Sequence, residues 1–152
     1  MGANSYDKDV VLWAQEQAAL LRSGQFSKLD LEHIADEIED VGKTEKRELA
    51  SRMAVLMAHL LKWQAQPDRR SRSWQSTINE QRKRIALALD ETPSLRTTIT
   101  ESKWRAAVWA DARVMAMTDT GLSGEAFPDE WPWPTDQALA EGWLPGADRL
   151  RP

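Results

Sequence analysis

Apolar residues recur every three or four positions between Leu29 and Pro67, which is the spacing of one face of an α-helix. At 100° per residue this face carries Leu31, Ile34, Ile38, Val41, Leu49, Leu56, Leu60 and Trp63. Charged or titratable side chains lie on or beside the same face, namely Glu37, Glu45, Glu48, Arg52 and His59. Proline disfavours helical geometry in the residue before it. The pattern therefore predicts one long helix between Asp30 and Pro67, or two helices that meet at Gly42.

The same periodicity predicts a helix on each side of this central one. Asp7 is the expected N-cap of a first helix over residues 7–23, which Gly24 ends. Its buried face is expected to contain Val10, Trp13, Ala14, Gln17, Ala18, Leu20 and Leu21. Ser71 or Ser73 is expected to cap a third helix, whose buried positions are Trp74, Ile78, Ile85 and Leu89.

A fourth helix and an irregular tail complete the chain. Thr92 and Pro93 form a strong helix start, and Gly121 is the expected end of a helix over residues 93–120. The tail that follows is rich in tryptophan and proline, which cannot sustain a long helix, although residues 135–141 are expected to form a short one. Its aromatic rings are expected to dock on the helices, because they would otherwise be exposed to water.

These elements predict an all-α fold, a four-helix-type bundle over residues 7–120 with the tail of residues 121–152 docked on it. The chain has 152 residues, of which 41% are hydrophobic and 29% charged, so we expect a single domain over residues 1–152. It has no cysteine, no signal-peptide pattern and no apolar stretch long enough to span a membrane. We therefore expect a cytoplasmic protein without a membrane partner.

The net charge of −4 conceals two segments of opposite sign. Residues 30–48 contain eight acidic and three basic residues, whereas residues 66–84 contain six basic and two acidic ones. The simplest interpretation is that the two segments neutralise each other as neighbours within one bundle.

Short motifs along the chain match an uncharacterised protein family. Near the start they are Tyr6-Asp7-x-Asp9, Trp13-x-x-Glu16-Gln17-Ala18 and Leu20-Leu21-Arg22-x-Gly24. In the centre they are Glu37-Ile38-Glu39-Asp40-Val41-Gly42-Lys43, Arg47-Glu48-Leu49, Ser51-Arg52 and His59-Leu60-Leu61-Lys62-Trp63. Further on they are Gln66-Pro67, Ser73-Trp74, Gln81-Arg82, Pro93-Ser94-Leu95, Ala112-Arg113, Thr120-Gly121-Leu122 and Phe127-Pro128.

On these residues the chain resembles domain-of-unknown-function family twenty-nine, a mainly bacterial family, over nearly its whole length. The resemblance implies a helical single domain. It implies no activity, because the family has no established catalytic or binding residues. The family pattern is tyrosine-rich at several positions where this chain has other residues, such as Ala65.

Arg52 and His59 lie seven residues apart and therefore share one helix face. Their spacing is similar to the short arginine–histidine signature of the HEPN ribonucleases, in which histidine would exchange a proton and arginine would stabilise phosphorane charge. The alternative is a structural network, in which Arg52 pairs with Glu48 one turn back and His59 donates to a carbonyl or an acid. Glu48, Arg52 and His59 are thus the catalytic candidates.

His33, Asp36 and Glu37 place three metal-ligating side chains on adjacent helical turns. The acidic pairs at positions 37 and 40 and at positions 45 and 48 are similar to the magnesium motifs of helical nucleotide pyrophosphohydrolases. Their order is reversed, however, and they lie too close together. We expect no metal and no cofactor, and His33, Asp36 and Glu37 are the ligands to consider if a metal binds.

A basic connector precedes the third helix, with Arg69, Arg70 and Arg72 just before Trp74. A basic loop beside an aromatic ring can contact phosphates and stack on a base. Trp74 also fits the apolar stripe of the helix, which is the structural interpretation.

The leading prediction is a non-catalytic interaction or regulatory module that binds a protein partner or a second copy of itself. It rests on the lack of a recognisable catalytic signature. The alternative is a protein directed at nucleic acid, either a HEPN-like ribonuclease through Arg52 and His59 or a binder of the phosphate backbone through Arg69, Arg70 and Arg72.

Overall fold

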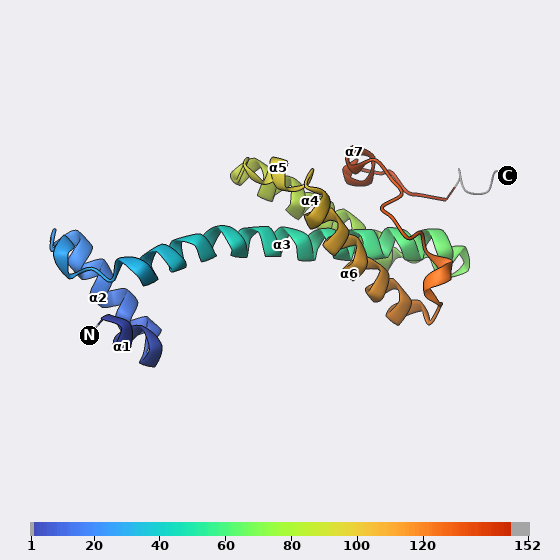
Figure 1. Cartoon of the computed structure of the whole chain (residues 1–152). Coiled ribbons are helices and arrows are strands. Elements are labelled where there is room, and N and C mark those ends of the chain that lie inside the picture. Colours follow the sequence, from blue (N-terminus) through green and yellow to red (C-terminus); the bar gives the residue numbers. More distant parts are fainter. Residues whose placement is uncertain (1, 147–152) are drawn as a thin grey trace. The chain divides into compact units, whose positions relative to one another are not determined.

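Helices make up the regular secondary structure of residues 2–146, the part of the chain that the computed structural model describes. The long helices are α2 (Val10–Arg22), α3 (Leu31–Ala65), α4 (Arg72–Glu91) and α6 (Ser102–Thr120) (Figure 1). The short helices are α1 (Gly2–Lys8), α5 (Leu95–Thr98) and α7 (Thr135–Leu139), and single 3₁₀ turns lie at Phe26–Lys28, Pro67–Arg69 and Gly124–Ala126. The prediction of an all-α fold is confirmed.

Contacts within the chain divide it inside α3, between Glu45 and Lys46, into two compact units. The N-terminal unit contains α1, α2 and the first part of α3, and the C-terminal unit contains the rest of α3 and all later elements. The expectation of one domain over residues 1–152 stays a prediction.

The central helix continues through Gly42 without a break, so the alternative of two helices that meet there is wrong. A Cβ atom added at Gly42 would meet nothing within 4 Å, so no other element among the described residues approaches closely at this position. The helix ends at Ala65, two residues before Pro67, as its proline signal predicts.

The core of the C-terminal unit is built around the second part of α3. Its apolar side chains there are almost fully buried, and so are the inner faces of α4 and α6. The residues that meet in this core include Leu49, Met53, Leu56, Met57, Leu60 and Leu61 of α3, Ile78 and Ile85 of α4, and Val108, Trp109, Ala112 and Ala116 of α6. Trp104, one turn before Trp109, is only half-buried, and its indole N–H lies 3.4 Å from the Lys46 carbonyl oxygen.

The tail packs against this core up to residue 146, as predicted, and its last residues, 147–152, lie outside the described part of the chain. Phe127, Trp133 and Ala138 are buried members of the core cluster. The tryptophan rings continue from α6 into the tail, with centroids 6.2 Å apart for Trp109 and Trp131, and 6.0 Å apart for Trp109 and Trp133. The Trp109 indole N–H also donates to the Pro128 carbonyl oxygen at 3.1 Å. The tail is therefore part of the C-terminal unit.

Two helix boundaries differ from their prediction. The first helix is split, because Asp9 rather than Asp7 is an N-cap and accepts a hydrogen bond from the backbone N–H of Leu12 at 3.0 Å. The fourth helix is interrupted between Thr98 and Ser102. The reason lies in a run of β-branched residues, in which the Thr100 hydroxyl donates to the Thr97 carbonyl oxygen and competes with the helical pattern.

Candidate functional site

A polar and aromatic network connects the three helices of the N-terminal unit. The Asp30 carboxylate accepts hydrogen bonds from the Trp13 indole at 2.9 Å and from His33 Nδ1 at 2.8 Å. The Tyr6 hydroxyl donates to Glu37 Oε1 at 2.7 Å, and its ring stacks on His33 with centroids 3.9 Å apart. These contacts join α1 and α2 to the start of α3.

The network shifts the pKa values of its members. The hydrogen bond to Glu37 raises the pKa of Tyr6 to about 12, since ionised tyrosine could not donate it. The hydrogen bond to Asp30 raises the pKa of His33 above its ordinary value. Burial acts to raise the pKa of Asp30, but the hydrogen bonds from His33 and Trp13 outweigh it and lower the pKa. His33 is thereby favoured in its charged form and Tyr6 in its neutral form.

The same network engages two of the three candidate metal ligands. His33 is bonded to Asp30 and Glu37 to Tyr6, whereas Asp36 is exposed. No group of three or more His, Asp or Glu side chains within the described residues is arranged to hold a metal ion. His33, Asp36 and Glu37 thus lie on α3 as predicted, but they do not converge.

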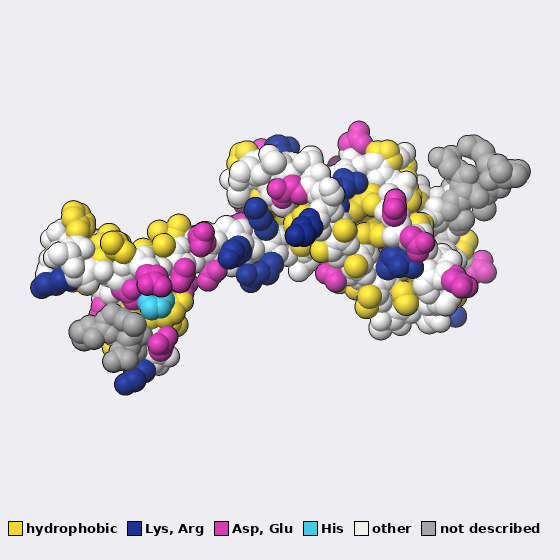
Figure 2. Space-filling view, viewed as in Figure 1, with side chains coloured by type: hydrophobic (Ala, Val, Ile, Leu, Met, Phe, Trp, Pro, Cys, Tyr) yellow, Lys and Arg dark blue, Asp and Glu magenta, His cyan; other side chains and the backbone are white. Residues whose placement is uncertain are grey.

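The N-terminal unit exposes most of its apolar side chains. Within residues 5–45 only Trp13 and Gln17 are buried, and Val10, Ala14 and Leu21 of the predicted inner face of the first helix are exposed. Figure 2 shows hydrophobic side chains beside acidic ones where Figure 1 places α1, α2 and the start of α3. The most exposed of its large hydrophobic side chains are Val10, Val11, Leu12, Leu21, Phe26, Leu31, Ile38 and Val41.

The apolar stripe of α3 changes character along its length. Leu49, Leu56 and Leu60 are at most 1% exposed, whereas Leu31 and Ile38 are 68% and 67% exposed. Periodicity located the stripe, but it did not show that the other described elements leave most of its first part exposed. We call this first part, formed by Leu31, Ile34, Ile38 and Val41, the α3 apolar row. Ile34 is half-buried, and the other three side chains are exposed.

The predicted line of Glu48, Arg52 and His59 is not a connected network. No hydrogen bond or ion pair links these three side chains in the described structure, and Glu48 is exposed. His59 instead donates from Nδ1 to the Val55 carbonyl oxygen at 2.9 Å, which leaves Nε2 as the acceptor. Burial lowers the pKa of His59 and outweighs the hydrogen bond to Val55, which acts to raise it, so the neutral form of His59 is favoured.

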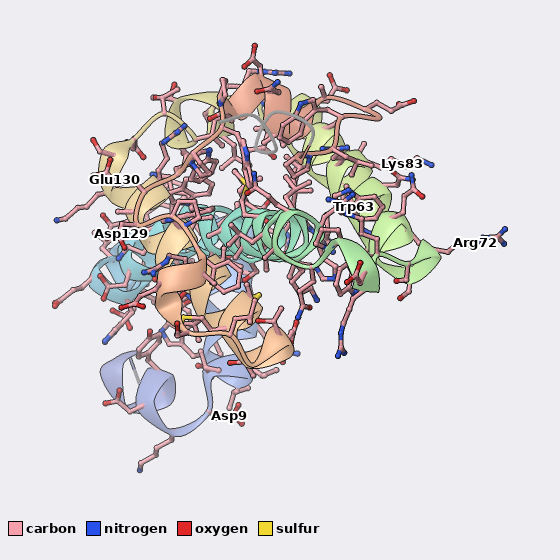
Figure 3. All side chains as sticks on the ribbon, turned by 90° about the vertical axis from the view of Figure 1, so that its right-hand side faces the viewer. Asp9, Trp63, Arg72, Lys83, Asp129 and Glu130 are labelled. Atoms are coloured by element: carbon pink, nitrogen blue, oxygen red, sulfur yellow. The ribbon has the colours of Figure 1, made fainter. Side chains whose placement is uncertain are left out.

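The basic connector is only partly free to bind a ligand. Arg69 and Arg72 are exposed and have no hydrogen-bond or ion-pair partner among the described residues, and Figure 3 shows Arg72 and Lys83 pointing away from α4. Arg70 donates to the Trp63 carbonyl oxygen at 2.7 Å. Trp74 is half-buried, with the Lys62 ammonium 5.1 Å from its ring centroid. One face of that ring is therefore already occupied.

A family model described as "Domain of unknown function DUF29" matches residues 5–144. The chain belongs to this family. The resemblance seen in its short motifs is thereby confirmed. Comparison with curated proteins and with solved structures gave no match.

The DUF29 match covers both units. It includes α2, the α3 apolar row and the tail as far as Leu144. Within the described residues, no helix combines the length and the apolar composition that crossing a membrane requires. Since the family description names no activity, a function for this DUF29 chain has to be inferred from its own surface.

Proposed function

We propose that this DUF29 chain is a non-catalytic protein-interaction module whose N-terminal unit binds a partner protein through its exposed apolar surface. The observation that carries the proposal is the exposure of three residues of the α3 apolar row, Leu31, Ile38 and Val41, together with that of Val10, Val11, Leu21 and Phe26. Folded proteins seldom expose large apolar patches unless these bind something.

Size supports the same conclusion. Helical units of roughly 40 residues bury too little apolar surface to be stable by themselves and usually need a metal, a disulfide or a partner. The chain has no cysteine. Each apolar side chain that a partner covers would contribute about 1.5–3 kcal/mol. A partner would thus supply the core that residues 5–45 do not form by themselves.

The test is a pull-down from cells that naturally produce the protein. The bait is the full chain in three forms, namely the wild type, Ile38→Gln and Val114→Gln. Val114 is the matched control, since it is 60% exposed and lies on α6 in the C-terminal unit. We expect one partner protein to be recovered in stoichiometric amount with the wild type and Val114→Gln, and to be lost with Ile38→Gln. Equal recovery with all three forms would contradict the proposal.

Binding to nucleic acid is the second candidate function, and the unpaired, exposed state of Arg69 and Arg72 favours it. With Arg70 bonded to Trp63, such binding would be mainly electrostatic and strongly weakened by salt. Fluorescence anisotropy with a labelled single strand would measure it. Loss of binding in Arg69→Gln/Arg72→Gln, but not in the α6 control Lys103→Gln, would support this candidate.

A further inference from the structure

The α3 apolar row has the spacing of a helix-binding seam. Its residues occur at positions i, i+3, i+7 and i+10, which repeats the a and d positions of a heptad over about 15 Å of helix. At 100° per residue they fall within about a quarter of the helix circumference. A helix laid along α3 would contact all four side chains at once, whereas a loop would not match this spacing.

Small residues border the row on one side. Ala35 and Gly42 lie one heptad apart next to Leu31 and Ile38, and both are exposed. Glycine in a helix interior costs about 1 kcal/mol relative to alanine. No contact within the part of the chain that the structure describes explains this cost, because the space around Gly42 is open. A partner helix could bring its backbone close to α3 at these two positions.

Acidic residues border the small residues and end the row. Around the helix, Ala35 and Gly42 lie between the row and two acids, Glu32 and Glu39. Glu45 lies one turn after Val41, in line with the row. All three acids are exposed. Up to Glu45 the chain has ten acidic and four basic residues. In a symmetric dimer the same surface meets itself, which would bring these acidic borders together. A second copy is therefore disfavoured as the occupant.

We propose that the α3 apolar row binds an amphipathic helix of a partner protein, whose apolar heptad positions are flanked by lysine or arginine. This inference rests on the proposed function and specifies the chemistry of its partner. The apolar residues of that helix would cover Leu31, Ile34, Ile38 and Val41. Its basic residues would face Glu32, Glu39 and Glu45.

The experiment uses two synthetic helical peptides of about three heptads, both with leucine at a and d. One carries lysine at e and g, and the other carries glutamate there. Calorimetric titration of the full chain is expected to show binding of the lysine peptide only. Ile38→Gln should weaken it roughly tenfold or more, and Val114→Gln should not change it. Equal binding of the glutamate peptide, or no effect of Ile38→Gln, overturns the inference.

A variant at Gly42 tests how closely the partner helix approaches. Gly42→Leu should raise the thermal stability of the free chain, since leucine is a better helix former and the space is open. It should nevertheless weaken binding of the lysine peptide, because the side chain separates the two helices. Unchanged or tighter binding overturns the inference.

Sedimentation of the wild type and Ile38→Gln separates failure of this inference from failure of the proposed function. A dimer that Ile38→Gln abolishes would make a second copy the occupant and overturn the inference, but it would keep the row as a protein-binding surface. If neither peptide binds, no such dimer forms, and partner recovery is independent of Ile38, the proposed function fails as well.

Discussion

Arg82 of α4 donates from Nε to the carbonyl oxygen of Ala138 in α7 at 2.9 Å. Its Nη2 donates to the carbonyl oxygen of Trp143 at 2.7 Å. The side chain is buried, and its guanidinium thus connects α4 to two points of the tail that lie more than fifty residues later in the chain.

Replacing Arg82 with alanine should destabilise the C-terminal unit by about 2–3 kcal/mol, because two carbonyl oxygens lose their donor. Urea unfolding followed by circular dichroism measures the change. Arg84→Ala is the control, since Arg84 is exposed and its one ion-pair partner among the described residues is Glu80 on the same helix. Equal stability of the two variants would show that the tail is held without Arg82.

Tyr6 should ionise at an unusually high pH, and it can be observed alone because it is the only tyrosine of the chain. We expect tyrosinate absorbance to rise with a midpoint near the pKa of about 12 in the native protein. In Glu37→Gln the midpoint should move back towards the ordinary pKa of 10.0. A native midpoint at the ordinary value would mean that Tyr6 does not donate to Glu37 in solution.

His33 should make the N-terminal unit less stable as the pH rises. Its pKa is raised in the folded chain, so its contribution is fully present below the ordinary value of 6.5 and is lost as the pH passes through the folded pKa. Hydrogen exchange of α2 amides at several pH values measures it. The comparison is with His33→Gln, in which this part of the pH dependence should vanish.

Removing the tail should unfold the C-terminal unit. A chain that ends at Thr120 lacks Phe127, Trp133 and Ala138 from its core and leaves the Trp109 indole without its acceptor. We expect the cooperative thermal transition of the full chain to disappear from calorimetry of residues 1–120. A retained transition would show that the tail is peripheral.

The wild-type chain should not cleave RNA, because Arg52 and His59 are not linked in the structure and the proposed function is binding. Incubation with a mixed RNA and gel analysis measures cleavage. Cleavage that disappears in His59→Ala would instead support a HEPN-like activity.

The sequence contains most of the information that fixes the helices. Pro67 and Gly121 end α3 and α6 through local backbone constraints, and Gly121 indeed has φ +75°. Periodicity did not predict the break before Ser102, because it does not register the Thr100 hydroxyl, which donates to the Thr97 carbonyl oxygen there.

The candidate site was harder to predict. Periodicity shows which residues share a helix face, but not whether another element covers that face. For this reason Leu31 and Leu56 look alike in the sequence and differ completely in exposure. The contact of Tyr6 with Glu37 spans 31 residues and has no local signal.

The side chains that hold the tail bind its main chain. Arg82, Trp109 and Arg113 all donate to backbone carbonyl oxygens, the last to Gly124 at 2.8 Å. Every residue type offers the same carbonyl, so these bonds impose little selection on tail side chains outside the core. These hydrogen bonds do, however, fix the number of residues between one bonded carbonyl oxygen of the tail and the next. Outside the core residues Phe127, Trp133 and Ala138, related proteins should therefore tolerate substitutions between Gly124 and Trp143 far better than insertions or deletions.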